Sequence, residues 1–308
     1  MWGWFKRKFR MREDYEKLII VDGDKFFIEK WTVLQCLMHV GIMTMIMQVI
    51  TGFPLKYWNT PWAKYIVDAL GGINGLMTIH RIEGAIMFFD FLFVVFYCII
   101  FMIVNRDRVK KYGIWDTYRL LPGPTDIAAV QYFAYLLGFR KAPPDYDEYM
   151  WVDKFDFYAV GWGMIAIGIT GWILWLPEVF CGFFGWPPET LQIALIAHAD
   201  EGMVAVGWIA LVHLYMVHYS PHKFPMDWVW LTGISPELEW MEERPRSWRR
   251  IIKRTAEHEP ELLEKYPALK ERYEFVKAIE NLPNEEIVLK IHEYAHHLLE
   301  KELSEEAA

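Results

Sequence analysis

The sequence predicts an all-α integral membrane protein, a four-helix transmembrane bundle followed by a helical, charged cytoplasmic tail. Three observations predict this class. Four long apolar runs lie between residues 31 and 219, Lys and Arg gather in alternate loops, and the last quarter combines amphipathic spacing with many Glu residues. We therefore divide the chain into a basic N-terminal segment at 1–30, a four-span domain at 31–219 and a tail at 220–308.

The four apolar runs are each long enough to cross a membrane, which takes about 20 residues in a helix. Residues 31–53 carry no formal charge, and the same holds for 157–177. The second span, 77–104, has Asp90 within its apolar part, and we favour a structural role for Asp90 over proton movement. The fourth, 191–219, contains His198, Asp200, Glu201, His213 and His218. Ionisable groups are costly inside a membrane, so these residues are candidates for function.

The loops orient the bundle because Lys and Arg accumulate on the cytoplasmic side. Segment 1–30 and loop 105–156 carry eight Lys and Arg residues each, whereas 54–77 carries two and 178–190 carries none. This bias predicts a multi-pass protein of the cytoplasmic (inner) membrane with both termini in the cytoplasm.

The tail accounts for most of the net charge of −8, because residues 233–308 hold 18 Glu against 12 Lys and Arg. Apolar residues at helical spacing, such as Ile287, Ile291 and Leu298, predict amphipathic helices separated by prolines. The negative charge argues against a nucleic-acid partner. The motif His292-Glu293-Tyr294-Ala295-His296 matches a zinc hydrolase pattern, but a solvated helix face explains it better so close to the C-terminus.

Four histidines fall at two depths of the predicted bundle. His80 and His198 lie near the outer face, whereas His39 and His213 lie in the cytoplasmic half. His213 follows His198 by 15 positions, which leaves both on nearly the same helix face. Two imidazoles from facing helices are the axial ligands of a b-type haem, which needs no Cys. The three scattered cysteines form no C-x-x-C motif, so covalent haem attachment and iron–sulfur clusters have no support.

Glycines follow two of these histidines by one helical turn, and this spacing leaves room for a flat ring. They are Gly84 after His80 and Gly202 after His198. The third span adds four more glycines, for which close helix packing is the alternative explanation. Arg81 is placed either to pair with a haem propionate or to reach the membrane interface.

The same residues resemble the di-haem cytochrome b membrane subunits of respiratory formate dehydrogenases, nickel–iron hydrogenases and thiosulfate reductases. The resemblance covers roughly residues 25–235. It rests on the following stretches: His39, Thr51-Gly52-Phe53-Pro54-Leu55, Ile79-His80-Arg81-Ile82-Glu83-Gly84, Asp153-Lys154-Phe155-Asp156, Thr170-Gly171, and His198 to His213.

The resemblance implies an electron conduit with two haem b groups, one on His80 and His198 and one on His39 and His213. It implies a quinone as substrate at a cytoplasmic-side site, for which Tyr149, Lys154 and Asp156 are the candidates. Tyr149-Met150 stands where relatives often have Tyr-Asn. The partner would be a periplasmic iron–sulfur subunit or a multihaem c-type cytochrome, with membrane lipid around the spans.

We therefore expect a quinone-reactive electron-transfer subunit of a respiratory oxidoreductase complex, with no catalytic residues for substrate chemistry of its own. Any named enzyme activity would belong to the complex, and the chain is not a stand-alone hydrolase. The alternative is a haem-free membrane anchor or proton-pathway subunit.

Overall fold

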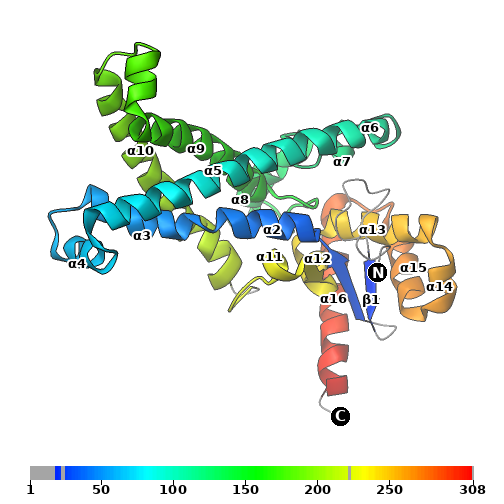
Figure 1. Cartoon of the computed structure of the whole chain (residues 1–308). Coiled ribbons are helices and arrows are strands. Elements are labelled where there is room, and N and C mark those ends of the chain that lie inside the picture. The colour runs from blue at the N-terminus through cyan, green and yellow to red at the C-terminus, as the bar shows by residue number, and fades with distance from the viewer. Residues whose placement is uncertain (1–17, 22–24, 221–222, 307–308) are drawn as a thin grey trace. The chain divides into compact units, whose positions relative to one another are not determined.

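The computed structural model describes residues 18–21, 25–220 and 223–306, and Figure 1 labels its helices and strands. Most of the predicted basic segment 1–30 lies outside the described residues. The chain divides into two compact units. One contains residues 35–100 and 156–227, which form most of the four spans, and the other contains 1–34, 101–155 and 228–308. We describe each unit separately.

Among the described residues, four helical segments are long and apolar enough to cross a membrane, which confirms the predicted fold class. The first, Val33–Lys56, is made of α2 (Val33–Ile42) and α3 (Met45–Lys56). The second is α5 (Gly72–Val104), and the third is α9 (Trp151–Trp175), which begins six residues before the predicted span. The fourth joins α10 (Glu189–Trp208) to two π-helical turns, η3 (Ile209–His213) and η4 (Tyr215–Tyr219).

Short helices connect the spans. Helix α4 (Pro61–Ala69) and the π-helical turn η2 (Glu178–Phe183) lie in the two predicted outer loops. The loop between the second and third spans contains α6 (Arg106–Tyr112), α7 (Ile114–Thr117), the 3₁₀ turn η1 (Pro124–Ile127) and α8 (Ala128–Leu136). Residues 118–123 and η1 separate α7 from α8.

The N-terminal segment and the tail together form a small antiparallel sheet that is not predicted from the sequence. Its strands are β1 (Leu18–Val21), β2 (Lys25–Glu29) and β3 (Ile234–Pro236), in the order β1-β2-β3. Alternation along β2 buries Phe26 and Ile28 and leaves Lys25 exposed, as expected for a sheet with one covered face.

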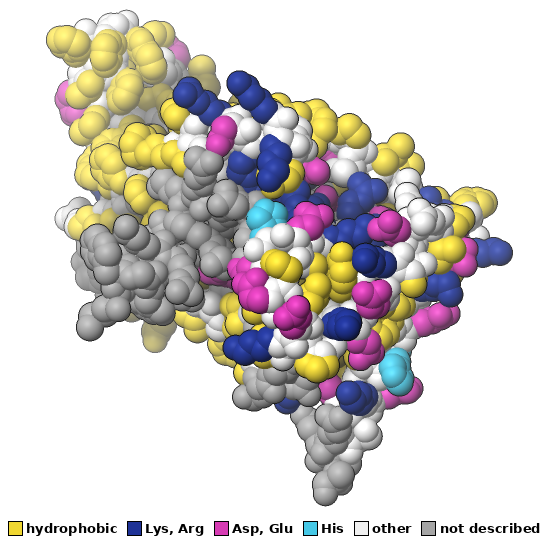
Figure 2. All heavy atoms as spheres, turned by 90° about the vertical axis from the view of Figure 1, so that its right-hand side faces the viewer, with side chains coloured by type: hydrophobic (Ala, Val, Ile, Leu, Met, Phe, Trp, Pro, Cys, Tyr) yellow, Lys and Arg dark blue, Asp and Glu magenta, His cyan; other side chains and the backbone are white. Residues whose placement is uncertain are grey.

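The tail folds into helices, most of which cover that face of the sheet. They are α11 (Val229–Thr232), α12 (Glu237–Glu243), α13 (Pro245–His258), α14 (Glu261–Lys265), α15 (Pro267–Ile279) and α16 (Asn284–Glu306). Trp240, Trp248 and Ile291 are buried with Phe26 and Ile28 in one hydrophobic core, which confirms the amphipathic helices predicted here. Acidic and basic side chains are interspersed over the outer surface of the tail in Figure 2.

Candidate functional site

His80 on α5 and His198 on α10 face each other within the span unit. Their ring centroids lie 6.1 Å apart, with the ring planes at 79°. The two residues are 118 positions apart in the sequence, so only the packing of the second span against the fourth brings them together.

The Nδ1 atom of His80 is held by the first span. Thr51 Oγ1 on α3 lies 2.9 Å from it and donates its own proton to the Met47 carbonyl oxygen at 2.7 Å. Because that hydroxyl proton is engaged, the oxygen accepts from His80 Nδ1–H. The remaining nitrogen, Nε2, therefore keeps the lone pair that a metal needs.

His198 is oriented in the same way by the third span, but with two acceptors. Its Nδ1 lies 3.0 Å from the Ile167 carbonyl oxygen and 3.2 Å from Thr170 Oγ1. A carbonyl can only accept, so Nδ1 carries the proton and Nε2 is again the nitrogen with a lone pair.

The second pair consists of His39 on α2 and His213 at the end of η3. Their ring centroids lie 6.3 Å apart, at an angle of 32°. Asp156 on α9 accepts from His213 Nδ1 at 3.0 Å and from the indole nitrogen of Trp208. A carboxylate that accepts from a ligand histidine fixes its ring and makes Nε2 more basic.

Both pairs have the spacing that one metal ion between two imidazoles requires. An imidazole–metal bond of about 2 Å, with each ring centre about 1 Å behind its nitrogen, places the two centroids about 6 Å apart. The observed separations of 6.1 and 6.3 Å agree with this value. Two neutral imidazoles with protonated Nδ1 atoms are the donor set of a six-coordinate haem b.

The glycines that face the imidazoles are Gly52 and Gly171. A Cβ added at Gly52 would lie 3.3 Å from His80 Cε1, and one at Gly171 would lie 3.2 Å from His198 Cε1. At Gly168 an added Cβ would overlap the Phe88 ring, so close helix packing, the alternative explanation, applies there.

The predicted ring clearances at Gly84 and Gly202 stay predictions. An added Cβ at Gly202 would meet no protein atom within 4 Å, and one at Gly84 would be 3.6 Å from Gln48 Oε1, an ordinary contact. The neighbouring protein atoms therefore leave room for a larger side chain at both positions. Arg81, for its part, lies over the ring of Trp175 with its guanidinium 5.9 Å from the centroid.

The three residues predicted for a quinone site fall in different surroundings. Asp156 contacts His213. Lys154 is buried in the unit that holds the tail, where its Nζ donates to Asp126 Oδ1 at 2.6 Å and to the Leu121 carbonyl oxygen at 3.1 Å. Tyr149 belongs to the same unit, and burial together with the neighbouring Glu148 carboxylate raises the pKa of its phenol well above the ordinary value.

The histidine motif of the tail has no metal-site geometry. His292 Nε2 lies 3.0 Å from the Glu242 carbonyl oxygen, so this nitrogen is engaged with α12. Within the described ranges 18–21, 25–220 and 223–306, no cluster of three or more His, Cys, Asp or Glu residues could hold a metal ion.

The fold and the paired histidines define a multi-pass membrane protein suited to bind haem through histidine. Residues 30–224 match the model of the family described as Prokaryotic cytochrome b561. The match covers most of the chain, including all four spans and both pairs, so the chain belongs to this family. It is accordingly a membrane haem b electron-transfer protein, which argues against the haem-free alternative. No curated protein matches the chain significantly.

Sequence reasoning missed the groups that orient the histidines. Thr51-Gly52 and Thr170-Gly171 are the same dipeptide on the first and third spans, each beside a histidine of the next span. This repetition is a signal that could have identified them. Asp156 is named above only for quinone contact, yet its observed partner is His213.

Proposed function

We propose that this chain is a di-haem cytochrome b subunit that carries electrons across the membrane between the quinone pool and a periplasmic redox partner. The observation that carries the proposal is the repeated geometry of the two histidine pairs, with centroid separations of 6.1 and 6.3 Å. Because the sequence predicts the two pairs at two depths of the membrane, two haems would bridge most of the bilayer.

The histidines and the groups that hydrogen-bond to them have separate roles in this proposal. Haem b, when bound, supplies one-electron transfer at each pair. His80 with His198, and His39 with His213, would hold the iron through Nε2. Thr51 accepts a hydrogen bond from Nδ1–H of His80, and the Ile167 carbonyl accepts one from Nδ1–H of His198. Asp156 accepts one from Nδ1–H of His213. These fixed hydrogen bonds hold the rings in place while the charge of the site changes.

The quinone site is proposed on the cytoplasmic side, near His213, with the chain in the inner membrane and both termini in the cytoplasm. The Lys and Arg bias of the loops supports this orientation. Asp156 is the best supported of the candidates Tyr149, Lys154 and Asp156, because it contacts His213 directly.

The periplasmic partner is proposed to be an iron–sulfur subunit or a multihaem c-type cytochrome of a respiratory complex. Exposed aromatic side chains on the two predicted outer loops, including Trp58, Tyr65 and Phe183, offer a docking surface. An exposed ion pair between Lys56 Nζ and Asp200 Oδ1, 2.8 Å apart, adds polar groups near the same end of the spans.

A haem count on the purified full-length chain tests the proposal. We expect two b haems per chain by pyridine haemochrome, and one in His198→Ala. The matched control His218→Ala, on the same span, should keep both. A wild-type chain with no haem would refute the proposal, and a His198→Ala variant with two haems and an unchanged spectrum would refute the pairing.

The location of the quinone site is tested separately. A water-soluble quinol added to membranes should reduce the haem b of the wild-type chain within a stopped-flow trace, and His213→Ala should slow this reduction strongly. Equal rates in both would show that quinol does not deliver its electrons near His213.

A further inference from the structure

Helix α8 and the residues just after it present a dense apolar surface to the outside of their unit. The side chains of Val130, Leu137 and Phe139 are 68%, 71% and 80% exposed. The exposed large apolar residues of this segment are Ile127, Val130, Tyr132, Phe133, Tyr135, Leu136, Leu137 and Phe139. Eight such residues within 13 positions form a patch, which we call the α8 patch, that would be unfavourable in water.

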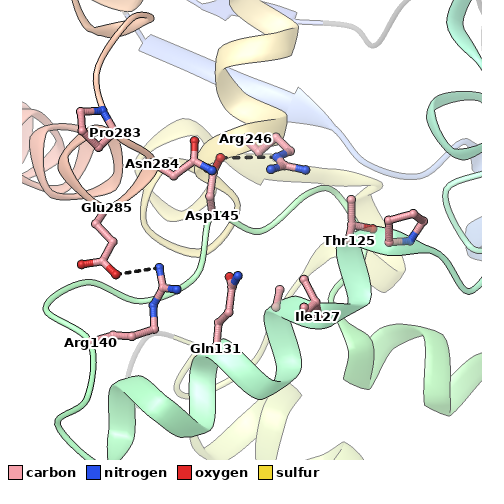
Figure 3. Close-up of a pocket in the computed structure, with 11 residues that line it drawn as sticks. Thr125, Ile127, Gln131, Arg140, Asp145, Arg246, Pro283, Asn284 and Glu285 are labelled. Carbon is pink, nitrogen blue, oxygen red and sulfur yellow. Dashed lines mark hydrogen bonds and ion pairs between the residues drawn. The ribbon is translucent and has the colours of Figure 1, made fainter.

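The other side of α8 faces the protein, and it is the less apolar side. Ala128 is buried there, and Gln131 lines a pocket of about 550 Å³. Figure 3 shows Arg140 and Arg246 at this pocket, paired with Glu285 at 3.1 Å and with Asp145 at 3.4 Å respectively. A helix on the surface of a soluble domain buries its apolar face and exposes its polar one. The arrangement around α8 is the reverse.

The position of α8 in the chain ties it to the ends of two spans. Lys154, in the first turn of α9, binds Asp126 in η1, which leads directly into α8. Tyr118 Oη donates to the Met102 carbonyl oxygen, in the last turn of α5, at 2.7 Å. These contacts belong to one unit, so the α8 segment is fixed close to the end of α5 and the start of α9.

We propose that α8 lies in the membrane–water interface, with the α8 patch covered by the acyl chains of the bilayer that the spans cross. Three features favour lipid over a protein partner. The patch is continuous in the chain with two span ends, its edge carries tyrosines, which concentrate at headgroup depth, and the exposed Lys141 lies two residues after Phe139, where lipid phosphates would lie.

Photocrosslinking in native membranes tests the proposal on the full-length chain. The photoreactive residue p-benzoylphenylalanine is introduced in place of Phe133, 55% exposed in the α8 patch. The same replacement at Phe96, 59% exposed on the second span, is the positive control for lipid contact. Replacement at Leu303, 57% exposed on α16 of the tail, is the matched control outside the membrane. Mass spectrometry of the irradiated, purified chains identifies the adducts.

The expected result is phospholipid adducts at position 133 in at least half the yield found at position 96, with none above background at 303. Adducts at 133 with a second copy of the chain or with another protein would overturn the proposal. So would an absence of lipid adducts at 133 in a sample where position 96 gives them. None of these outcomes depends on haem binding or on the quinone reaction, so the proposal fails or stands independently of the proposed function.

Discussion

Replacing Thr51 with valine removes one oxygen atom and keeps the branched shape of the side chain. In the folded chain that oxygen accepts from His80 Nδ1 at 2.9 Å. No second acceptor for this Nδ1 is found in the described part of the chain, in contrast to His198. After the change Thr51→Val, the proton of Nδ1 faces an apolar side chain inside the spans.

The size of the effect follows from that loss. A buried donor left without its acceptor costs about 1–3 kcal/mol. Removing the hydrogen-bond partner of a metal-binding histidine lowers metal affinity roughly 10- to 100-fold, which corresponds to a free energy in the same range. We therefore expect the haem proposed between His80 and His198 to dissociate roughly 10 to 100 times faster in Thr51→Val.

The equivalent change at Thr170 should have a much smaller effect. His198 Nδ1 keeps the Ile167 carbonyl oxygen at 3.0 Å, which is closer than Thr170 Oγ1 at 3.2 Å. The Ile167 carbonyl still accepts this hydrogen bond after the substitution. We therefore expect the haem dissociation rate to change by no more than about threefold in Thr170→Val. The two Thr-Gly dipeptides look alike in the sequence, and the structure predicts that they respond differently.

The assay is haem transfer to an excess of apomyoglobin, followed by absorbance on the detergent-solubilised chain. Thr78→Val is the matched control, because Thr78 Oγ1 also donates to a carbonyl one turn earlier, that of Asn74 at 2.8 Å, but contacts no histidine. Equal rates in Thr51→Val and Thr170→Val, or a Thr51→Val rate equal to that of Thr78→Val, would refute the reasoning.

Two further predictions concern carboxylates. Asp156→Asn should raise the midpoint potential of the haem on His39 and His213 by about 40 mV in a redox titration, because a charged acceptor that favours oxidised iron by about 1 kcal/mol is lost. Burial alone would raise the pKa of Asp147, but the Arg250 guanidinium, bonded to both of its oxygens, lowers it to about 2. Because the pKa of Asp147 is lower in the folded state, its ionised form stabilises the fold at pH values above the unfolded pKa of 3.8. This contribution disappears as the pH falls toward 2. Asp147→Asn should therefore lower the stability by about 2 kcal/mol at pH 7, and its thermal unfolding midpoint should approach that of the wild type between pH 4 and pH 2.

These two predictions carry their own controls. The haem on His80 and His198 is the internal reference for Asp156→Asn, and an equal shift of both midpoints would contradict the assignment. For Asp147→Asn, a stability difference that stays constant down to pH 2 would show that the ion pair with Arg250 is not its source.

The spans and the pairing of the histidines by depth could be predicted from the sequence because both depend on local rules. A membrane requires about 20 apolar residues for each helix and excludes unpaired charge, so the lengths of the apolar runs and the Lys and Arg counts carry the information. Helical periodicity then relates His198 to His213 along one span. The tail helices follow from the same periodicity, with prolines at their starts.

The small sheet could not be predicted because its strands are too short and too distant in the sequence. Strand β2 pairs with β3 across about 200 residues, and β3 contains only three. Neither strand has a pattern strong enough to be distinguished from a loop, and each is stabilised by the tail helices that cover it.

By itself, the sequence determined that this is a four-span membrane protein with histidines at two depths, since hydrophobic length and charge bias act within single segments. Only the tertiary structure decided which nitrogen of His80, His198 and His213 is available, that Thr51 acts alone whereas Thr170 shares its role with a carbonyl, and that Asp156 serves His213. It also decided that α8 exposes its apolar side. The physical reason is that these hydrogen bonds and this burial depend on side chains of different helices. The spacing of residues along the chain does not show which of those side chains meet.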